Sequence, residues 1–343
     1  MIKAGIIGAT GYAGVELVRI LLNHPFVELA AISSVSFEGK KISEIYPSLY
    51  GVYDETLSDG DTVIKKSDVV FASLPHGISQ PLAKACLGAG KIFIDLGADF
   101  RLRDEDTYRK WYDGGFDDKT LHEKAVYGLP EIYAGSIKNA KLIANPGCYP
   151  TSAALALYPG LLMGVCEKTG IIIDSKSGAT GAGRGLALNT HFAELNEGFS
   201  AYKAGVHRHS PEIEQTLSDI AGERISITFV PHLLPVNRGI LTTVYAKNKG
   251  FSLSRIHEVY SDFYKDAAFV KVLNPGEYAN IKNVRMTNMC HISLHLDEHT
   301  DTIIITSAID NMVKGAAGQA VQNLNIVFGL PEDEGLKGTA PSF

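Results

Sequence analysis

The first residues of the chain predict a strand, a glycine-rich turn and a helix in immediate succession. An apolar stretch at residues 2–7 is followed by GATGYAG and then by VELVRILLNH, in which apolar side chains recur at helical spacing. Glycines also occur in tight turns for structural reasons alone, and the spacing here is GxxGxxG, not the more familiar GxGxxG. Their position between a strand and an amphipathic helix favours a dinucleotide site, with the pyrophosphate at the helix N-terminus.

The second predicted strand ends in hydroxyl side chains. Residues 27–32 are followed by Ser33 and Ser34, about twenty positions after the glycine turn. An NAD-specific site normally carries an acidic residue there, which binds the ribose hydroxyls. Serines at a strand end are also common loop residues. Because this strand ends in hydroxyls where an acidic residue would be expected, and Ser36, Lys40 and Lys41 lie close behind, we predict NADP as the cofactor.

Two further strands, at 69–74 and 92–96, complete the pattern of a parallel sheet. The first ends in Pro-His-Gly and the second leads through Gly-Ala-Asp-Phe to Arg101. Ligands of open α/β sheets bind at the carboxyl ends of the strands. Arg101 is therefore a candidate to receive an anionic substrate group, the alternative being an ordinary arginine on the surface.

A cysteine lies between a short strand and a helix in KLIANPGCYPT. Residues 141–144 predict the strand and residues 152–157 predict the start of the helix, with an Asn-Pro-Gly turn between them. Backbone N–H groups and the dipole at a helix N-terminus favour thiolate over thiol. A buried structural cysteine is the alternative. The turn favours a reactive Cys148.

Two histidines flank an arginine just before another predicted helix. His207, Arg208 and His209 precede Ser-Pro-Glu, in which the serine predicts an N-cap and the proline the first helical position. A single histidine at such a place is usually structural, whereas this cluster favours a site. The HxH spacing also suits a metal, but no third ligand lies nearby in the sequence, and we predict none.

The second half of the chain is rich in strands. Predicted strands lie at 171–174, 225–230, 240–246, 270–273, 291–296 and 302–308, with Pro231 and Pro235 separating the second of these from the third. The glycine-rich KSGATGAGR after the first strand suits either a ligand-contacting loop or a flexible surface loop. Strands without regular intervening helices predict a mostly antiparallel sheet. The final helix, rich in small residues, is expected to pack on the nucleotide domain.

The fold class is therefore α/β, with a Rossmann-type parallel-sheet domain and an α+β domain. We place the NADP-binding domain at 1–147 with 312–343 and the catalytic and dimerisation domain at 148–311. Four separated cysteines without a CxxC pair fit a reducing compartment. The net charge of −6 argues against nucleic-acid binding, and the longest apolar run, broken by Pro159 and Gly160, is too short for a membrane span. With no signal peptide before the first strand, we predict a cytoplasmic protein.

Seven motifs together resemble one family. GATGYAGVEL, LPHG, DLGADFR, NPGCYPT, KSGATGAGR, HRHSPEI and DNMVKGAAGQAVQN occur in this order across essentially the whole chain. The set resembles the N-acetyl-γ-glutamyl-phosphate reductases of arginine biosynthesis, which are related to the aspartate-semialdehyde dehydrogenases. The resemblance implies reduction of an acyl phosphate by NADPH to an aldehyde and inorganic phosphate, in a homodimer or homotetramer.

The resemblance also assigns roles to residues. Cys148 corresponds to the nucleophile, which forms a thioester, and His209, with His207 beside it, lies in the acid/base segment. Val35 stands where relatives are expected to carry a basic residue, which Lys40 or Lys41 would replace. Arg101, Asn145, Arg208 and Glu212 are the candidates for substrate or phosphate contacts. The candidates for cofactor contacts are Gly8, Thr10, Gly11, Tyr12, Ala13, Gly14, Ser33, Ser34, Pro75, Gly178 and Asn311.

Two alternatives stay open. A related enzyme would act on another acyl phosphate, such as aspartyl phosphate or a carrier-linked aminoadipyl phosphate. A protein of a different class would bind NADP without catalysis, as a sensor or scaffold. The reactivity of Cys148 towards iodoacetamide, compared with that of the other three cysteines, distinguishes an enzyme from a sensor.

Overall fold

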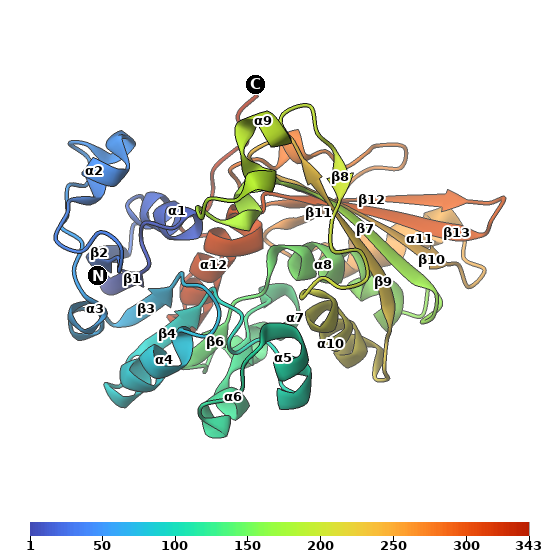
Figure 1. Ribbon diagram of the computed structural model, residues 1–343. Coiled ribbons are helices and arrows are strands. Elements are labelled where there is room, and N and C mark those ends of the chain that lie inside the picture. The colour runs from blue at the N-terminus through green and yellow to red at the C-terminus, as the bar shows by residue number, and fades with distance from the viewer. Residues whose placement is uncertain (343) are drawn as a thin grey trace. The chain divides into compact units, whose positions relative to one another are not determined.

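The computed structural model describes residues 1–342 and divides into two compact units (Figure 1). The first unit comprises Met1–Pro146 and Ala316–Lys337, and the second comprises Gly147–Gly315 with residues 338–342. The expected boundaries differ from this division at Gly147, at 312–315 and at 338–342, all of which belong to the second unit and were expected in the first. Residues 312–315 belong to the second unit because the carboxylate and carbonyl of Asp310 accept hydrogen bonds from their backbone.

The first unit contains a six-stranded sheet in which every neighbouring pair is parallel, as predicted. Its order is β2-β1-β3-β4-β6-β5. The strands are β1 (Ile2–Ile7), β2 (Val27–Ser33), β3 (Val69–Ala72), β4 (Ile92–Asp95), β5 (Val126–Tyr127) and β6 (Leu142–Ala144). Strands β3, β4 and β6 are buried at every residue, which accounts for their continuous apolar sequences.

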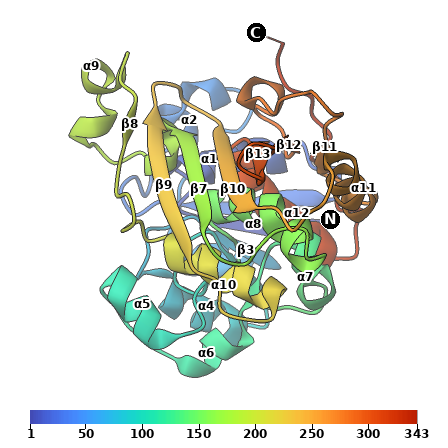
Figure 2. The same ribbon diagram turned by 90° about the vertical axis from the view of Figure 1, so that its right-hand side faces the viewer.

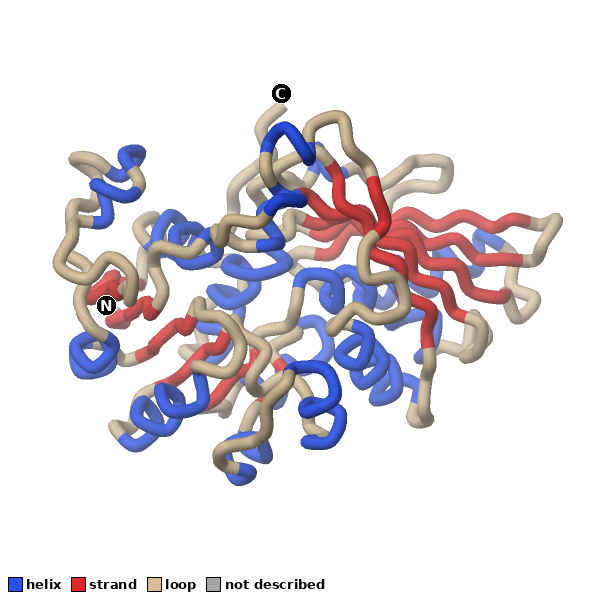
Figure 3. Tube along the Cα trace, viewed as in Figure 1, coloured by secondary structure: helices blue, strands red, loops and turns tan. Residues whose placement is uncertain are grey.

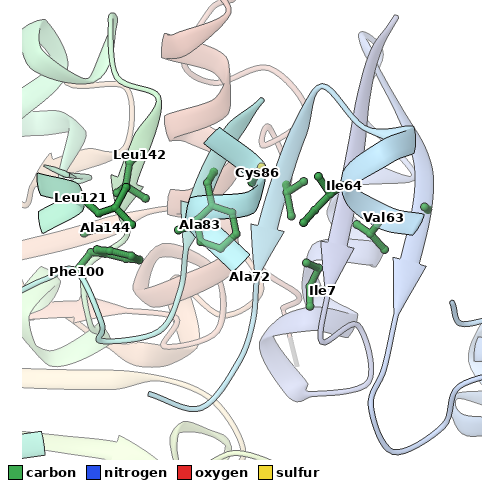
Figure 4. Close-up of a cluster of buried hydrophobic side chains, with 13 residues drawn as sticks. Ile7, Val63, Ile64, Ala72, Ala83, Cys86, Phe100, Leu121, Leu142 and Ala144 are labelled. Atoms are coloured by element: carbon green, nitrogen blue, oxygen red, sulfur yellow. The ribbon is translucent and has the colours of Figure 1, made fainter. Parts of the chain in front are cut away.

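Helices connect these strands and cover the sheet. They are α1 (Tyr12–Leu21), α2 (Ile42–Ile45), α3 (Gly60–Lys66), α4 (Ser79–Gly88), α5 (Glu105–Tyr112), α6 (Lys119–Lys124), α7 (Pro130–Ile137) and α12 (Gly318–Val327), with a 3₁₀ turn at Pro47–Leu49. Figure 4 shows one core cluster, where Val63 and Ile64 of α3 and Ala83 and Cys86 of α4 pack towards the sheet.

The last helix, α12, returns to the first unit and packs against α1 and α7. Its polar side chains are buried, and two of its asparagines are hydrogen-bonded within the first unit. Asn323 donates to the carbonyl of Gly128 at 2.9 Å, and Oδ1 of Asn325 lies 2.9 Å from Nε2 of His24. These contacts explain how a helix rich in Gln and Asn is buried at the end of the chain.

The second unit contains a seven-stranded mixed sheet within the described residues (Figures 2 and 3). Its order is β11-β12-β13-β10-β7-β9-β8. The pairs β7–β9 and β11–β12 are parallel and the other four are antiparallel. The strands are β7 (Ile171–Gly178), β8 (Ser200–Ala201), β9 (Ile227–Leu234), β10 (Ile240–Lys247), β11 (Val270–Val272), β12 (Cys290–Asp297) and β13 (Thr302–Ile309).

One face of this sheet packs against helices. α8 (Cys148–Leu162) lies on β10 and β13, α11 (Leu253–Tyr264) lies on β11 and β12, and α10 (Ser210–Ala221) contacts α8 and β9. The shorter elements are α9 (Phe192–Leu195), 3₁₀ turns at Ala179–Ala182, Leu188–Thr190 and Ile281–Asn283, and a π-helical turn at Val313–Ala317. No helix within residues 1–342 is long and apolar enough to span a membrane.

Three details differ from the sequence predictions. Helix α8 begins at Cys148, not at Ser152, and continues past Pro159 to Leu162. Pro231 lies within β9 and does not end it. Its carbonyl accepts a hydrogen bond from the amide of Tyr202, which follows the two-residue strand β8. A residue's amide and carbonyl point to the same side of a strand, so the missing N–H of Pro231 faces the nearly open edge, where proline is tolerated.

Candidate active site

The glycine turn of the first unit packs so tightly that side chains are excluded at two positions. Gly8 has φ +89°, and a Cβ there would lie 2.3 Å from the Ser73 carbonyl oxygen. A Cβ on Gly14 would lie 2.1 Å from the Gly8 carbonyl oxygen, whereas one on Gly11 would have no contact under 3.6 Å. The chain therefore needs glycine at 8 and 14 for its own packing, while Gly11 leaves open space.

The N-terminus of α1 is suited to an anion. Gly11 is its N-cap, no side chain caps the helix, and no acidic residue lies in its first turn, which begins with Tyr12 and Ala13. The first N–H groups of a helix have no partner within the helix, and the dipole is positive there. This arrangement fits a pyrophosphate group.

The end of β2 is joined to the glycine turn. The Ser33 carbonyl accepts from the amides of Gly8 and Ala9, and Oγ of Ser34 lies 2.7 Å from Oγ1 of Thr10. Val35 is 90% exposed, and Lys40 and Lys41 are exposed as well. The predicted cofactor residues of this region thus form one hydrogen-bonded group without a carboxylate.

The loop after β3, which carries Pro75, is held by a buried aspartate that the sequence did not single out. Asp99 accepts from the amide of Gly77 at 2.5 Å and from that of Ser79 at 2.8 Å. Burial, together with the nearby charge of Asp99, raises the pKa of Asp95 to about 7. Both carboxylates lie within DLGADFR, the only sequence signal for them.

Arg101 is buried and anchored within the first unit. Its Nε donates to the Asn145 carbonyl at 2.9 Å, and Nη2 donates to the Leu96 carbonyl at 2.7 Å. The side chain of Asn145 donates to the Ala316 carbonyl and accepts from Asn323. The two residues are thus brought together, and the surface alternative for Arg101 is wrong. Their contacts with phosphate stay a prediction.

Cys148 occupies the first position of α8 in the second unit, following the N-cap Gly147. It is half-buried, whereas Cys86, Cys166 and Cys290 are buried. Burial raises the pKa of Cys86 to about 12 and that of Cys166 to about 11, so these two thiols are inert near neutrality. The position at a helix N-terminus distinguishes Cys148, because the dipole there stabilises a thiolate.

Glu212 supports the turn before the cysteine. Its carboxylate is fully buried on α10, and Oε1 accepts from the Gly147 amide at 2.8 Å. Helix α10 begins at Ser210 with His209 as its N-cap, one residue before the predicted cap at Ser210. The contact ties the N-terminal parts of α8 and α10 together. The predicted substrate role of Glu212 stays a prediction.

The two histidines lie against each other beside Tyr149. Their ring centroids are 4.9 Å apart, and that of Tyr149 lies 5.6 Å from His207 and 5.9 Å from His209. The hydroxyls of Tyr149 and Tyr202 are 2.9 Å apart. Burial, assisted by the positive charges of Lys203 and Arg208, lowers the pKa of His207 to about 4. Tyr149 directly follows Cys148 in sequence, but no sequence signal identifies Tyr202.

The remaining predicted residues of the second unit differ in exposure. Arg208 is exposed, whereas Gly178 and Asn311 are buried at the ends of β7 and β13. Asn311 accepts from the Gly239 amide at 2.7 Å and donates to Oγ1 of Thr180 at 3.0 Å. Asn311 thereby joins two of the loops at this edge of the sheet, and its contact with the cofactor stays a prediction.

Family models match both units. Residues 3–140 match the semialdehyde dehydrogenase NAD-binding domain, and residues 148–311 match the semialdehyde dehydrogenase dimerisation domain. Among solved structures, aspartate semialdehyde dehydrogenase II from Vibrio cholerae has a TM-score of 0.74 at 18% identity, covering 96% of this chain and 98% of that one. The enzyme from Candida albicans, solved with NADP, has a TM-score of 0.70 at 15% identity, covering 96% and 98%. The predicted fold class is confirmed.

Curated relatives are similar over the full length. A protein named N-acetyl-gamma-glutamyl-phosphate reductase from Brachyspira hyodysenteriae is 57% identical, with 100% of both chains covered. One of the same name from Clostridium botulinum is 56% identical, again over 100% of both chains. The chain therefore belongs to the N-acetyl-gamma-glutamyl-phosphate reductases, a family of nicotinamide-dependent oxidoreductases built on the semialdehyde dehydrogenase fold.

Proposed function

We propose that this chain reduces N-acetyl-γ-glutamyl phosphate with NADPH, giving N-acetylglutamate semialdehyde and inorganic phosphate. The observation that carries the proposal is the half-buried Cys148 at the N-terminus of α8, in a unit that also presents the His207–His209 pair. The full-length relatives of that name support the substrate. A thiolate nucleophile and an acid/base group are what reduction through a thioester needs.

Cys148 divides the reaction into two easier steps. Its thiolate attacks the acyl carbon, the bond from that carbon to the phosphate oxygen breaks, and inorganic phosphate leaves with the electron pair. The product of this step is a thioester on Sγ. The helix N-terminus stabilises the thiolate before attack, and the first backbone N–H groups of α8 support the negative oxygen that forms during it.

His209 serves as the acid/base group. After reduction the former carbonyl oxygen carries negative charge, which His209 neutralises by giving a proton. The same ring takes the proton back as the bond between carbon and Sγ breaks and the aldehyde leaves. Burial keeps His207 neutral, and we propose that His207 fixes the position of His209.

The first unit supplies the residues proposed for the pyrophosphate and the ribose phosphate of the cofactor. The uncapped N-terminus of α1 suits the pyrophosphate, and the hydroxyls of Ser33 and Ser34, with no carboxylate beside them, suit the 2′-phosphate of NADP. When bound, NADPH supplies the hydride that reduces the acyl carbon. Pro75, Gly178 and Asn311 are proposed as further contacts. Arg101, Asn145, Arg208 and Glu212 are proposed to contact substrate or phosphate.

Oxidation in the reverse direction tests the substrate. The purified chain is given NADP, inorganic phosphate and one of three aldehydes: N-acetylglutamate semialdehyde, aspartate semialdehyde or aminoadipate semialdehyde. We expect phosphate-dependent formation of NADPH with the first, at a kcat/KM at least about 10²-fold above the others, since the site's polar groups suit one acyl chain. Faster oxidation of another aldehyde would reassign the substrate. No oxidation of any would favour the non-catalytic alternative.

We further propose that two copies pair through the sheet face opposite the helices. Along β7, β9, β10 and β13, residues Ile172, Val230, Tyr245 and Ile304 alternate with buried ones and are partly or well exposed. The match to a dimerisation domain supports this face. Tyr245→Asp should convert dimers to monomers, as measured by light scattering, while Lys265→Asp, at the exposed C-terminal end of α11 on the helix-covered side, should not. A monomeric wild-type protein contradicts the proposal.

A cytoplasmic location stays a prediction. All four cysteines are free, which supports a reducing compartment.

A further inference from the structure

A buried aspartate ends β13 and organises the backbone that follows. The side chain of Asp310 has no exposure, and its Oδ1 accepts from the amides of Met312 at 2.8 Å and Val313 at 3.2 Å. Its carbonyl oxygen accepts from the amide of Gly315 at 2.9 Å. One residue thus holds three of the next five amides, and the chain there forms a π-helical turn at Val313–Ala317.

The turn passes directly against the nucleophile. A Cβ on Gly315 would lie 2.7 Å from the Cβ of Cys148 and 3.2 Å from its Cα, so only glycine allows this approach without displacement. Because protein interiors are close-packed, the path of the backbone at Gly315 limits where Cys148 can lie. Single π-helical turns within helical segments are frequent at functional sites.

The other carboxylate oxygen of Asp310 reaches two further loops. Oδ2 accepts from the Met286 amide at 2.6 Å and lies 3.5 Å from Nη1 of Arg238. Met286 has φ +62°, a backbone conformation that non-glycine residues rarely adopt and that its surroundings must hold in place. Arg238 lies in the turn between β9 and β10. The carboxylate therefore joins the loop before β12, the β9–β10 turn and the segment at Gly315.

We propose that Asp310 is a positioning residue for the catalytic cysteine, acting through the backbone of Gly315. The proposal rests on the proposed function only in taking Cys148 as the nucleophile. The carboxylate suits this task because it accepts hydrogen bonds and donates none. In Asp310→Asn, either orientation of the amide turns an NH₂ group towards backbone N–H groups, so at least one buried donor loses its acceptor.

Alkylation of Cys148 by iodoacetamide, followed by peptide mass spectrometry over a pH series, tests the position of the thiol without substrate. Asp310→Asn and Gly315→Ala should each slow alkylation at neutral pH by about tenfold, because a displaced thiol loses part of the helix-terminus stabilisation. Each should lower kcat by about 10²-fold, the expected effect of a misplacement of about 1 Å. The affinity for NADPH should stay within twofold. Alkylation of the double variant should be no slower than that of the slower single variant, because both substitutions act on the same contact.

Tyr260→Phe is the matched control. It removes a buried hydrogen bond of 2.8 Å between the tyrosine hydroxyl and the Ala156 carbonyl, farther along α8. It should lower the melting temperature and leave the alkylation profile of Cys148 unchanged, which separates positioning from stability. If Asp310→Asn does not fold, Gly315→Ala carries the test. Alkylation within twofold of wild type in either folded variant, or multiplicative effects in the double variant, would overturn the proposal. Turnover by Cys148→Ser would instead refute the proposed function.

Discussion

The Nδ1 atom of His207 accepts a hydrogen bond of 3.1 Å from the backbone amide of His209. Nδ1 therefore carries no proton, and the proton of the neutral ring is on Nε2. Ring contacts with Tyr149, Tyr202 and Phe229 enclose the imidazole at centroid distances of 5.6, 5.6 and 5.5 Å. A neutral, enclosed His207 that holds its neighbour's backbone favours His209 as the acid/base group.

Replacing each histidine separately should distinguish the two roles. His209→Asn should lower kcat by about 10²- to 10⁴-fold and remove an ionisation from the pH–rate profile, as loss of an acid/base group does. His207→Gln should lower kcat less and leave the ionisations of the profile in place. Steady-state kinetics from pH 5 to 9 give both results. An unchanged profile in His209→Asn would move the acid/base role to His207.

Cys148→Ser should abolish turnover and leave NADPH binding intact, because a serine hydroxyl is a far weaker nucleophile than a thiolate and Cys148 is not among the residues proposed to contact the cofactor. Fluorescence titration with NADPH and assays of acyl-phosphate reduction measure the two properties. Cys86→Ala is the control, since this cysteine is buried within the core of the first unit and should be dispensable for turnover. Substantial reduction by Cys148→Ser would exclude the thioester.

Protonation of His207 should reduce stability in acid. The folded-state pKa is about 4 and the unfolded value about 6.5, so between these pH values the unfolded chain binds more protons. The contribution of neutral His207 to the free energy of unfolding is thus fully present above about pH 6.5. It is lost as the pH falls towards 4, by up to roughly 3 kcal/mol. Urea unfolding of wild type and His207→Gln at pH 7 and pH 4.5 measures the difference. Parallel decreases in both proteins would assign the pH dependence to other groups.

Two glycines of the nucleotide turn should behave differently. Gly14→Ala should lower the melting temperature as well as NADPH affinity, because its Cβ would lie 2.1 Å from the Gly8 carbonyl oxygen. Gly11→Ala meets nothing closer than 3.6 Å and should fold normally, yet bind NADPH at least about tenfold more weakly if the cofactor approaches this backbone. Thermal unfolding and NADPH titration separate the effects. Full affinity in Gly11→Ala would place the pyrophosphate elsewhere.

Local patterns in the sequence determined much of this protein. Strand, glycine turn and helix at the N-terminus, the Asn-Pro-Gly turn before Cys148 and the proline after the histidines all act through φ preferences, periodicity and helix ends within a few residues. These preferences operate in any surrounding structure. The fold class was therefore predictable from the chain alone, and the same local patterns placed Cys148 and the two histidines next to helix starts.

Tertiary structure decided what depends on partners far apart in sequence. Glu212 meets the turn before Cys148 across 65 positions, and Gly315 meets Cys148 itself through a contact that no local motif encodes. Pro231 stays within a strand because that strand is nearly an edge, which depends on sheet order. The neutrality of His207 likewise comes from burial among aromatic rings. Local propensities determine which turn or helix end carries each functional side chain. Long-range packing determines the neighbours, the charge state and the position of that side chain.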